Sequence, residues 1–543
     1  MSHSKAKKPI RALCLALALL TLSACGGSEA APEESALLGM PGEELGIGEA
    51  ADAVFSLNYN SQASLNPYAT DDTDNLLISQ LVYDNVFELD DDFNLTSRIL
   101  EDWEVSANGA YWTFTVKEDI PMHDGSELTA YDVAYSISLA RRTDRYSGRF
   151  QCMYGASASD ERTFHISTTK AHRLIPYLLT VPVVKDGSAS QTRPAGTGPY
   201  MYVEDADYIE AFPGYGSSVP VERIYMKEYT GAENIIAAFE NSYIDLVVND
   251  ASGASNIGYG GNTETRWYNT LNMHYIGFNM ESDMVSNPSV RYALSLAVDR
   301  QTAADSYMKD GATAAALPIS PASPLYNGEL ASQLNYNLSL CAQVLEGAGV
   351  SDMDNDGRLE QLYASQLRDF ELDLIVCSQS SGKGDVCNRF AEDMDSLGVT
   401  VNVRELSWSD YLSALHGDDL DGDGQPDVHF DMYYAEVKLG ADFDLTALLT
   451  EEGSLNYGGI TDSSYATYIN DYLAADDLTR SSESYELLRY IAANAPIIPV
   501  CFERHEVITH RNVITGMNVT ANNVFFNISD WTITFSDEDR EEK

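Results

Sequence analysis

Short strand-like runs alternate with helical stretches from about residue 54 to residue 500, and this alternation constrains the fold more than any other feature. Residues 111–116 alternate apolar and polar side chains as a half-buried strand does, and residues 372–376 and 399–403 are also strand-like. Residues 130–137 and 290–297 carry apolar side chains at helical spacing. No period of roughly 20–50 residues repeats, as a solenoid would require. The pattern predicts an α/β protein.

Two of the expected helices have recognisable first residues. Thr129 followed by Asp132 is a capping box, and Asn287 followed by Pro288 combines an N-cap with proline at the first helical position. We therefore expect helices to begin at residues 130 and 288. Residues 74–86 also have helical spacing.

The chain begins with a segment typical of export. A basic start is followed by an apolar run over residues 12–22, which is too short to span a bilayer, and then by Leu22-Ser23-Ala24-Cys25. This ending resembles the bacterial lipobox, in which the cysteine thiol is acylated. We predict a lipoprotein signal peptide at 1–24, lipidation of Cys25, and a flexible acidic tether at 25–51. The alternative is an ordinary secretory leader.

Length and charge limit what the remaining chain can be. Removing the leader leaves 543 − 24 = 519 residues, which is too long for one hydrophobic core and predicts two or three lobes. The formal net charge of −50 repels phosphate and excludes a general nucleic-acid binder. No later apolar stretch is long enough to span a membrane. We expect an extracytoplasmic protein that is lipid-anchored to the cell membrane.

The cysteines do not form a disulfide scaffold. Without Cys14 and Cys25, five remain, and five cannot all pair. Cys377 and Cys387 are close enough in sequence for a loop disulfide, and buried free thiols are the alternative.

Four motif stretches occur in one order along the chain. They are residues 100–109 with 112–114 and 122–133, residues 196–200, residues 275–279 with 290–300, and residues 495–499. Together they resemble the family 5 extracellular solute-binding proteins of ABC importers, the oligopeptide and dipeptide class. Met122 departs from the family pattern, and the late W-x-x-D-x-x-D-P stretch is matched only loosely, by residues 433–444.

The resemblance implies an architecture. It implies the two-lobed periplasmic-binding-protein-like fold of the large class, with an additional domain and the ligand in a cleft between the lobes. Lobe one would comprise residues 52–84, 185–272 and 505–536, the additional domain residues 85–184, and lobe two residues 273–504.

The resemblance also implies a function. Such a protein captures a peptide and delivers it to an ABC permease with its ATPase subunits, and we expect a monomer. Enzyme signatures such as G-x-S-x-G and H-E-x-x-H are missing, so we expect no catalysis and no required cofactor. Two alternatives stay open: another solute, such as a nickel chelate, haem or a sugar, and a surface signalling or adhesion protein on the same fold.

Residues that could hold a peptide follow from its chemistry. A carboxylate would meet the α-amino group, a cation the α-carboxylate, and polar-tipped aromatic residues would line the cleft. Glu436 resembles the family's amino-terminus site most closely, with Asp442 and Arg404 as the other charged candidates. The aromatic candidates are Tyr59, Tyr68, Tyr83, Trp408, Tyr433 and Tyr434.

Two acidic loops fit D-x-D-x-D-G-x-x-[DE], in which alternate carboxylates around a glycine turn can converge on Ca²⁺. Neither loop has the twelfth-position glutamate of an EF-hand, so the alternative is a solvated acidic turn. We expect structural calcium at one or both loops. The candidate ligands are Asp352, Asp354, Asp356 and Glu360 in the first loop and Asp419, Asp421, Asp423 and Asp427 in the second.

Overall fold

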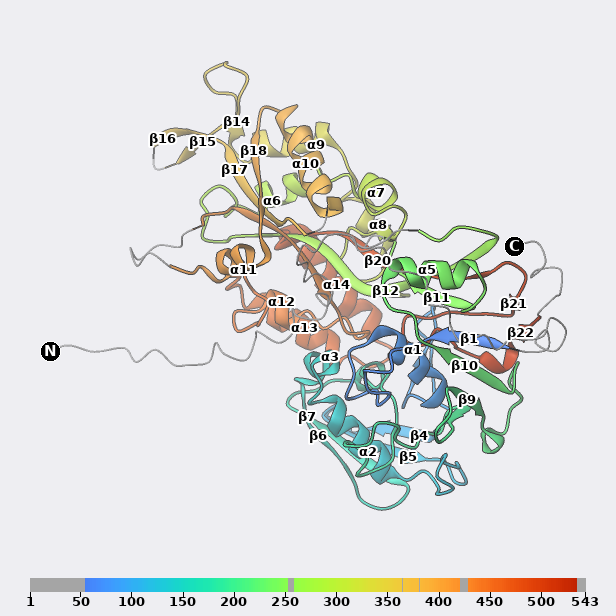
Figure 1. Cartoon of the computed structure of the whole chain (residues 1–543). Coiled ribbons are helices and arrows are strands. Elements are labelled where there is room, and N and C mark those ends of the chain that lie inside the picture. The colour runs from blue at the N-terminus through green and yellow to red at the C-terminus, as the bar shows by residue number, and fades with distance from the viewer. Residues whose placement is uncertain (1–53, 252–257, 364, 380, 420–427, 535–543) are drawn as a thin grey trace.

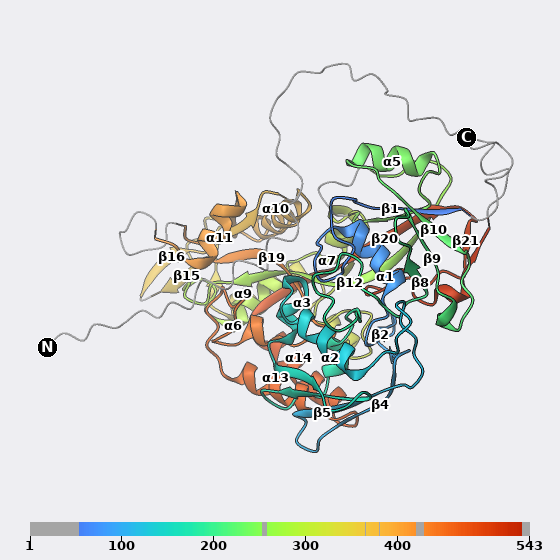
Figure 2. The same ribbon diagram turned by 60° about the horizontal axis from the view of Figure 1, so that its bottom comes forward.

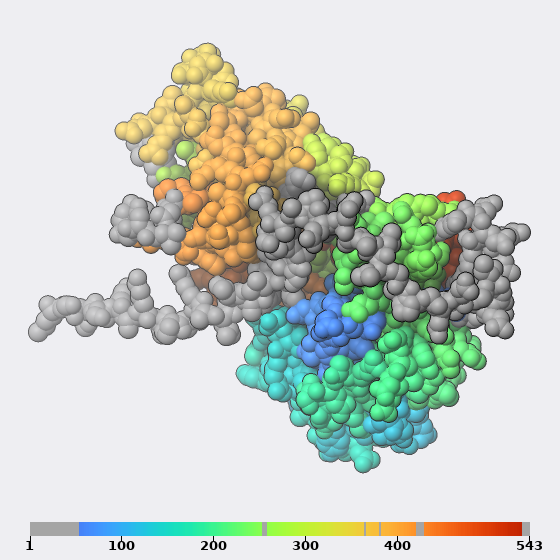
Figure 3. Space-filling view, in the orientation of Figure 1, coloured from blue at the N-terminus to red at the C-terminus, as the bar shows by residue number. Residues whose placement is uncertain are grey.

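The computed structural model describes residues 54–251, 258–363, 365–379, 381–419 and 428–534. Figure 1 shows two masses, one drawn in blue to green and the other in yellow to orange, with strands β12 (Thr263–Phe278) and β20 (Ile497–His510) running between them. The same division is visible after rotation in Figure 2 and on the molecular surface in Figure 3. The structure is α/β, as the sequence predicts.

Lobe one is built on a four-stranded sheet in the order β1-β10-β9-β8, in which β1 and β10 are parallel. Its core comes from three separate parts of the chain, residues 55–83, 184–268 and 507–531. The elements in these parts are β1 (Phe55–Asn58), α1 (Thr73–Val82), β8 (Tyr200–Tyr202), β9 (Tyr208–Ala211), η3 (Pro213–Tyr215), β10 (Arg223–Lys227), α5 (Ala232–Glu240), β21 (Ile514–Thr515), η5 (Ile528–Asp530) and β22 (Thr532–Ile533).

The additional domain has its own core, whose buried members all lie between residues 86 and 183. An antiparallel sheet in the order β4-β5-β7-β6 packs against helix α2. The elements are β2 (Glu88–Leu89), β3 (Leu95–Thr96), β4 (Leu100–Val105), β5 (Tyr111–Val116), α2 (Ala130–Ala140), α3 (Asp144–Ser147), η2 (Gly148–Phe150), β6 (Met153–Ala158), β7 (Thr163–Thr168) and α4 (Ile175–Leu178).

Lobe two surrounds a mixed sheet in the order β11-β20-β12-β19-β17-β18, with β13 beside β20. Side chains of β12 alternate between two cores, because Tyr275 enters one and Ile276 the other. The strands are β11 (Leu246–Asn249), β13 (Ala312–Ala314), β17 (Glu371–Cys377), β18 (Thr400–Leu406) and β19 (Met432–Lys438), with a small sheet of β14 (Val350–Ser351), β15 (Glu360–Tyr363) and β16 (Gln366–Asp369).

The two cores of lobe two are covered by helices on both faces of this sheet. They are α6 (Pro288–Ser295), α7 (Arg300–Thr302), η4 (Ala303–Tyr307), α8 (Gly328–Ser332), α9 (Leu338–Gly347), α10 (Ser381–Asp395), α11 (Trp408–His416), α12 (Thr446–Leu449), α13 (Ser464–Ala474) and α14 (Arg480–Asn494).

Strands β12 and β20 pair over most of their length, but their register shifts between Asn269 and Met273. Asn269 lies opposite Arg504 and Met273 opposite Phe502, so β12 contains two extra residues there. The hydroxyl of Thr270 donates to the carbonyl of Glu503 at 2.8 Å. A side chain therefore replaces part of the interrupted backbone ladder.

The expected helix starts are observed. Helix α2 begins at Ala130, where the Asp132 carboxylate accepts from the Thr129 amide at 2.8 Å, and α6 begins at Pro288, with the Asn287 side chain accepting from Ser289. The helix expected over residues 74–86 instead ends at Val82, because Tyr83 has an extended backbone.

The glycines in the motif at residues 196–200 have a steric role. A Cβ atom at Gly198 would lie 2.5 Å from the carbonyl carbon of Val82, and one at Gly196 would lie 2.4 Å from the Val82 oxygen. Only glycine allows this segment to pack so closely against the end of α1.

The domain boundaries predicted from the sequence remain predictions.

The cysteines resolve the choice between a disulfide and free thiols. Cys377 and Cys387 are both free and buried. Burial raises the pKa of the Cys387 thiol well above its usual range, so this side chain acts as a small apolar residue. The loop disulfide considered from the sequence does not form in the structure.

Candidate functional site

Strand β19 is the framework of the candidate site, because it brings charged side chains to one face of the sheet. It pairs antiparallel with β12, and in that register Glu436 lies opposite His274 and Lys438 opposite Asn272. Glu436 and Lys438 are two residues apart, so both side chains leave the same face of the strand. Both residues are exposed.

Glu436 belongs to a network of charges. The Lys383 ammonium, at the start of α10, lies 2.5 Å from Oε2 of Glu436. His274 Nε2 lies 3.7 Å from the same oxygen and 2.8 Å from Oε1 of Glu503. Oε1 of Glu436 has no hydrogen-bond partner within the described ranges. One oxygen of this carboxylate thus remains available to a ligand.

Glu503 anchors the inner side of this network. Its Oε2 accepts from the Asn272 side chain at 2.7 Å. Burial alone would raise the pKa of Glu503, but the hydrogen bond and charge of His274, with help from Asn272, outweigh burial and lower the pKa to about 2. Glu503 is therefore ionised throughout the physiological pH range.

Lys438 lies at the end of β19, and its ammonium makes no hydrogen bond or ion pair with any described residue. Protein around its ammonium removes part of the hydration, and Arg149 and Arg145 repel the charge, so the pKa falls to about 8. The side chain is nevertheless exposed, and solvent reaches it. The positive charge of Lys438 is therefore repelled by the positive charges of Arg149 and Arg145.

The two arginines come from the additional domain, on α3 and η2. Arg145 lies 3.2 Å from Asp71 and is neutralised there, whereas Arg149 donates to the hydroxyl of Thr180 at 3.1 Å and has no ion-pair partner within the part of the chain described. Both guanidinium groups lie over the ring of Tyr146, at 5.9 and 5.2 Å from its centroid. The Tyr68 ring lies 6.0 Å from the Tyr146 ring.

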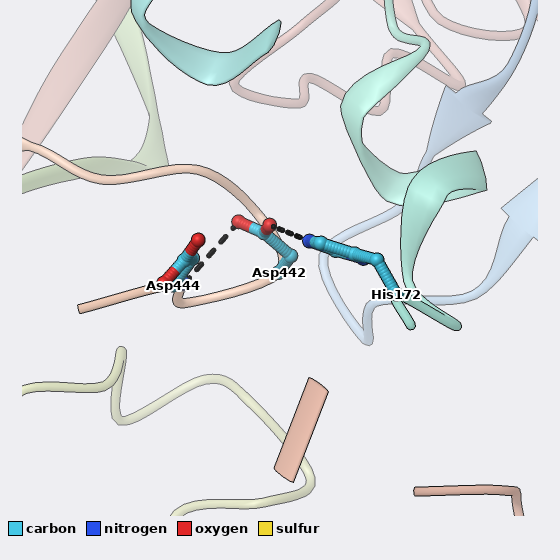
Figure 4. A group of neighbouring side chains, drawn as sticks. All are labelled: His172, Asp442 and Asp444. Carbon is cyan, nitrogen blue, oxygen red and sulfur yellow. Dashed lines mark hydrogen bonds and ion pairs between the residues drawn. The ribbon is translucent and has the colours of Figure 1, made fainter. Parts of the chain in front are cut away.

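A second contact between the additional domain and lobe two follows β19. Figure 4 shows His172 pointing at Asp442, with Asp444 beside it. His172 Nε2 lies 3.0 Å from Oδ2 of Asp442, and its Nδ1 accepts from the amide of Leu174 at 3.2 Å. One ring nitrogen donates while the other accepts, which assigns a neutral imidazole with its proton on Nε2.

The Asp442 segment is tightly fixed. The hydroxyl of Tyr472 donates to the Asp442 carbonyl at 2.7 Å, and a Cβ atom at Gly440 would lie 2.3 Å from Oδ1 of Asp442. A larger residue at position 440 would therefore force this carboxylate to move. Asp442 is buried, in contrast to Glu436.

Three groups of side chains have ligand atoms within 4.8 Å of one another and could hold a metal ion. Hydrogen bonds and ion pairs already join the first two groups, and Lys383 is paired with Oε2 of Glu436. The third is the acidic loop at 352–360. The groups are His172 with Asp442 and Asp444, His274 with Glu436 and Glu503, and Asp352 with Asp354, Asp356 and Glu360.

The structure brings together the four carboxylates of the first acidic loop. Asp352, Asp354 and Asp356 are exposed, and Glu360 is buried at the start of β15, where it accepts from the Met353 amide at 2.7 Å. Backbone amides donate to all three aspartates, as in an acidic turn. In the second loop Asp419 is exposed, whereas Asp421, Asp423 and Asp427 lie outside the described residues.

The aromatic candidates occupy different environments. Tyr68 lies at the Arg149 contact and donates to the carbonyl of Pro182, and Tyr59 is half-buried in lobe one. Trp408 is half-buried at the start of α11 and stacks on Tyr411. The remaining three are core residues and offer no surface to a ligand in this conformation: Tyr83, Tyr433 and Tyr434, at 2%, 3% and 1% exposure.

The charged candidates also differ in position. Arg404 lies on β18 and donates to the carbonyl of His429 at 3.0 Å, two strands away from β19. The cation paired with Glu436 is instead Lys383, and Lys438 lies two residues further along β19. Sequence reasoning did not select them, or His172, His274 and Glu503. Only Lys438 could have been selected from its local sequence, because polar residues at 436 and 438 alternate with apolar ones on β19.

Within the described residues, no helix is both long enough and apolar enough to cross a bilayer. This finding concerns residues 54–534 with their gaps and does not include the leader.

Comparison with known proteins gives one consistent result. The model of the bacterial extracellular solute-binding proteins, family 5, matches residues 94–437. The oligopeptide-binding protein AppA of Bacillus subtilis is 22% identical, with 98% of this chain and 99% of AppA covered. The haem-binding protein A of Haemophilus influenzae is 21% identical, with 78% of this chain and 82% of that protein covered.

Solved structures show the same fold. HbpA2 from Haemophilus parasuis aligns with a TM-score of 0.70 at 19% identity, covering 89% of this chain and 99% of that one. NikA from Brucella suis, solved with Fe(III)-EDTA, aligns with a TM-score of 0.67 at 17% identity, covering 88% and 99%. AppA from Bacillus subtilis, solved with a nonapeptide, aligns with a TM-score of 0.59 at 18% identity, covering 89% and 99%.

Proposed function

This chain belongs to the bacterial extracellular solute-binding proteins of family 5, and on that premise we propose that it captures peptides outside the cell for an ABC importer. A permease and its ATPase subunits would receive the peptide from it. The full-length similarity to a protein named for oligopeptide binding supports this choice of solute. The protein would act by binding alone, without catalysis.

The observation that carries the proposal is the placement of opposite charges on β19. The side chains of Glu436 and Lys438 leave one face of the strand, and their Cα atoms are about 7 Å apart at the usual rise of a strand. A short peptide is a zwitterion whose two ends need opposite partners. Oε1 of Glu436 would accept from the α-amino group while Oε2 remains paired with Lys383.

Calorimetry with a mixed library of di- to hexapeptides tests this proposal. N-acetylation removes the ligand's positive charge, so acetylated peptides should bind at least about tenfold more weakly. Glu436→Gln should bind free peptides more weakly, so that the difference in affinity between free and acetylated peptides becomes smaller. Glu371→Gln changes an exposed residue on β17 and should behave as wild type.

Asp442→Asn tests whether Asp442 or Glu436 holds the α-amino group of the peptide. If Asp442 holds the amino group, this variant and not Glu436→Gln will lose the preference for free over acetylated peptides. Equal affinity for both peptide forms in the wild type would contradict amino-group recognition at either residue. No heat from any peptide would leave a non-peptide solute as the function.

A non-peptide solute is the second candidate, and one specific observation favours it. Lys438 and Arg149 would suit the carboxylates of a metal chelate or of haem as well as those of a peptide. Relatives on this fold include a haem-binding protein and a structure that contains Fe(III)-EDTA. Calorimetry with haem and with nickel–histidine is the corresponding test.

Two further parts of the proposal concern the membrane and calcium. Acylated Cys25 would anchor the protein to the outer face of the cell membrane, with residues 25–51 as the tether. The carboxylates of Asp352, Asp354, Asp356 and Glu360 would hold a structural Ca²⁺ ion, because hard cations prefer several oxygen ligands.

A further inference from the structure

Three neighbouring strands of the lobe-two sheet bring a histidine and two glutamates together. His274 lies on β12, Glu436 on β19 and Glu503 on β20, and β12 pairs with both of the other strands. His274 Nε2 lies 2.8 Å from Oε1 of Glu503 and 3.7 Å from Oε2 of Glu436. The three ligand atoms all lie within 4.8 Å of one another. An imidazole nitrogen with two carboxylates is a donor set for a first-row divalent metal ion such as Zn²⁺.

The spacing of these atoms is close to what a zinc ion needs. Ligand atoms about 2.1 Å from a tetrahedral ion lie about 3.4 Å from one another. The two distances from His274 fall on either side of that value, so binding an ion requires side-chain shifts of about 1 Å. All three residues lie on paired strands and not on loops, which limits the free energy needed to hold them in place.

The hydrogen bond on the far side of the His274 ring permits metal binding. Nδ1 of His274 lies 3.1 Å from the hydroxyl of Tyr434, which has no other hydrogen-bond partner among the described residues. A hydroxyl can donate or accept, so the ring proton can be on Nδ1 and leave the Nε2 lone pair for an ion. Metal-bound histidines usually donate this second N–H group to an acceptor in the protein.

The group around His172 lacks this freedom, although its ligand atoms meet the same distance limit. Nδ1 of His172 accepts from the backbone amide of Leu174, which can only donate. The ring proton is therefore held on Nε2, the nitrogen that points at Asp442. An ion at that nitrogen would force a second N–H group against the Leu174 amide. His172 thus acts as a hydrogen-bond donor and not as a metal ligand.

Glu503 is also held in position by its neighbours. The Asn272 side chain donates to its Oε2 at 2.7 Å and leaves Oε1 facing His274. Thr270 donates to the Glu503 carbonyl at 2.8 Å, in the stretch of β12 that contains two extra residues. Such irregularities change the direction in which nearby side chains of a sheet point. Here the irregular stretch fixes both the backbone and the carboxylate of Glu503.

Lys383 is the cation that faces these carboxylates in the structure. Its ammonium lies 2.5 Å from Oε2 of Glu436. One ammonium balances only one of the two carboxylates, and a flexible lysine side chain can turn away into solvent. His274 and Glu503 are buried, whereas the Glu436 side chain is 41% exposed, so an ion can reach the group from solvent at Glu436.

We infer that His274, Glu436 and Glu503 form a binding site for a first-row divalent metal ion such as Zn²⁺. Lys383 competes with the ion for the Glu436 carboxylate. Three protein ligands leave one position of a four-coordinate ion open to solvent. Side chains of this chain alone would bind the ion, so the site goes beyond solute capture and does not depend on which solute is captured. The acidic loop at 352–360 differs in chemistry, because it offers only oxygen atoms.

Calorimetry with Zn²⁺ tests the inference on the full chain, stripped with a chelator, dialysed and kept in excess Ca²⁺ to occupy the acidic loops. Wild type should bind one Zn²⁺ ion per chain, and His274→Gln and Glu436→Gln should each weaken binding at least about tenfold. Lys383→Gln should tighten it about threefold or more, because the competing charge is gone. His429→Gln, which changes an exposed histidine elsewhere, should behave as wild type.

Co²⁺ gives a readout that a purely structural ion-pair network would not produce. Bound in place of Zn²⁺, it should show the visible absorption bands of an ion with few ligands. Tyr434→Phe keeps the ring and removes the hydroxyl, so it should weaken both metals about tenfold. Thermal melting of each variant controls for folding. Glu436 is exposed, so Glu436→Gln keeps the test decisive even if His274→Gln does not fold.

Two results would overturn the inference. One is that wild type shows no saturable binding of Zn²⁺. The other is equal affinity in wild type and Glu436→Gln, which would show an adventitious ion only. No peptide is present in these titrations, so neither result bears on peptide capture.

Discussion

The imidazole Nε2 of His172 donates to Oδ2 of Asp442 at 3.0 Å, although 270 positions separate the two residues in sequence. Their side chains are 0% and 4% exposed. The bond joins the additional domain to the segment that follows β19. The amide of Arg173 also donates to the carbonyl of Leu473 at 2.7 Å, so backbone and side chain reinforce the same contact.

The first prediction is that His172→Ala destabilises the protein by about 2–4 kcal/mol, because it leaves the Asp442 carboxylate buried without this donor. Urea unfolding at neutral pH measures the change. His165→Ala is the matched control, because His165 is only half-buried on β7, and it should cost much less. Equal losses in the two variants would show that the buried pair contributes nothing specific.

The second prediction concerns Glu88. Burial, with a contribution from Asp84, raises its pKa from 4.5 to about 8. Its Oε1 accepts from Asn85 and Asn523, whereas Oε2 is buried without a partner in the described part of the chain. The carboxyl group is therefore protonated near pH 7 in the folded state and ionised in the unfolded state.

Stability should respond to pH in a defined direction. The folded state binds a proton that the unfolded chain releases, so the contribution of Glu88 is complete below pH 4.5 and is lost as pH rises toward 8. Glu88→Gln should exceed wild type by roughly 1–3 kcal/mol at pH 8 and by less at pH 5. Urea unfolding at both pH values checks this, with exposed Glu204→Gln as the control. A constant difference between variant and wild type would argue against a buried acid.

The third prediction concerns Lys438 and a carboxylate ligand. Because the pKa of Lys438 is about 8, its charge is present at pH 7 and largely absent at pH 9.5. Affinity for an N-acetylated free-acid peptide, which has no α-amino group to titrate, should fall by about threefold to tenfold over that interval. Lys438→Arg should keep its affinity at pH 9.5, and an equal decline in that variant would assign the pH effect to another group.

The fourth prediction concerns anchoring. Cys25→Ala should release the protein from membranes, because a thioether-linked diacylglycerol provides two buried chains. Fractionation together with labelled fatty acid measures both attachment and acylation, and Cys152→Ala serves as the matched cysteine control. A Cys25→Ala protein that still sediments with membranes, beside a wild type that takes up no label, would refute lipidation.

The fifth prediction is that chelation lowers the melting temperature and that millimolar-range Ca²⁺ restores it, because an ion that binds only the folded state stabilises that state. Asp354→Asn should reduce the response through the 352–360 loop, whereas exposed Asp471→Asn should not. Superimposable melting curves with chelator and with Ca²⁺ would end the calcium proposal.

Local features of the fold were predictable from the sequence. The capping box at Thr129 and the Asn287–Pro288 pair mark helix starts, because the residues that decide them lie within one turn. Strand β5 covers residues 111–116 as its alternation indicates. The helix at residue 74 stops early because packing of residues 196–198 against Val82 decides its end, and that contact is over a hundred residues away.

The candidate site was predictable only in part, for the same reason. Glu436 and Asp442 could be selected because they lie in one recognisable stretch. Lys438 lies in that stretch too, but its meaning depends on Arg149, almost three hundred residues earlier. His172 is an isolated histidine in the sequence, and only the fold places it against Asp442.

The irregular pairing of β12 with β20 has a mechanical consequence. The chain passes between its two masses along this ribbon, and the ladder is interrupted between Asn269 and Met273. Twisting one mass against the other would strain side-chain bonds there, from Thr270 and Asn272 to Glu503, before it strained a continuous ladder. Asn272 is also the partner of Lys438 across β12 and β19. The interruption of the ladder and the cationic end of β19 thus share one strand position, so a solute held at Lys438 would lie beside the irregular part of the ribbon.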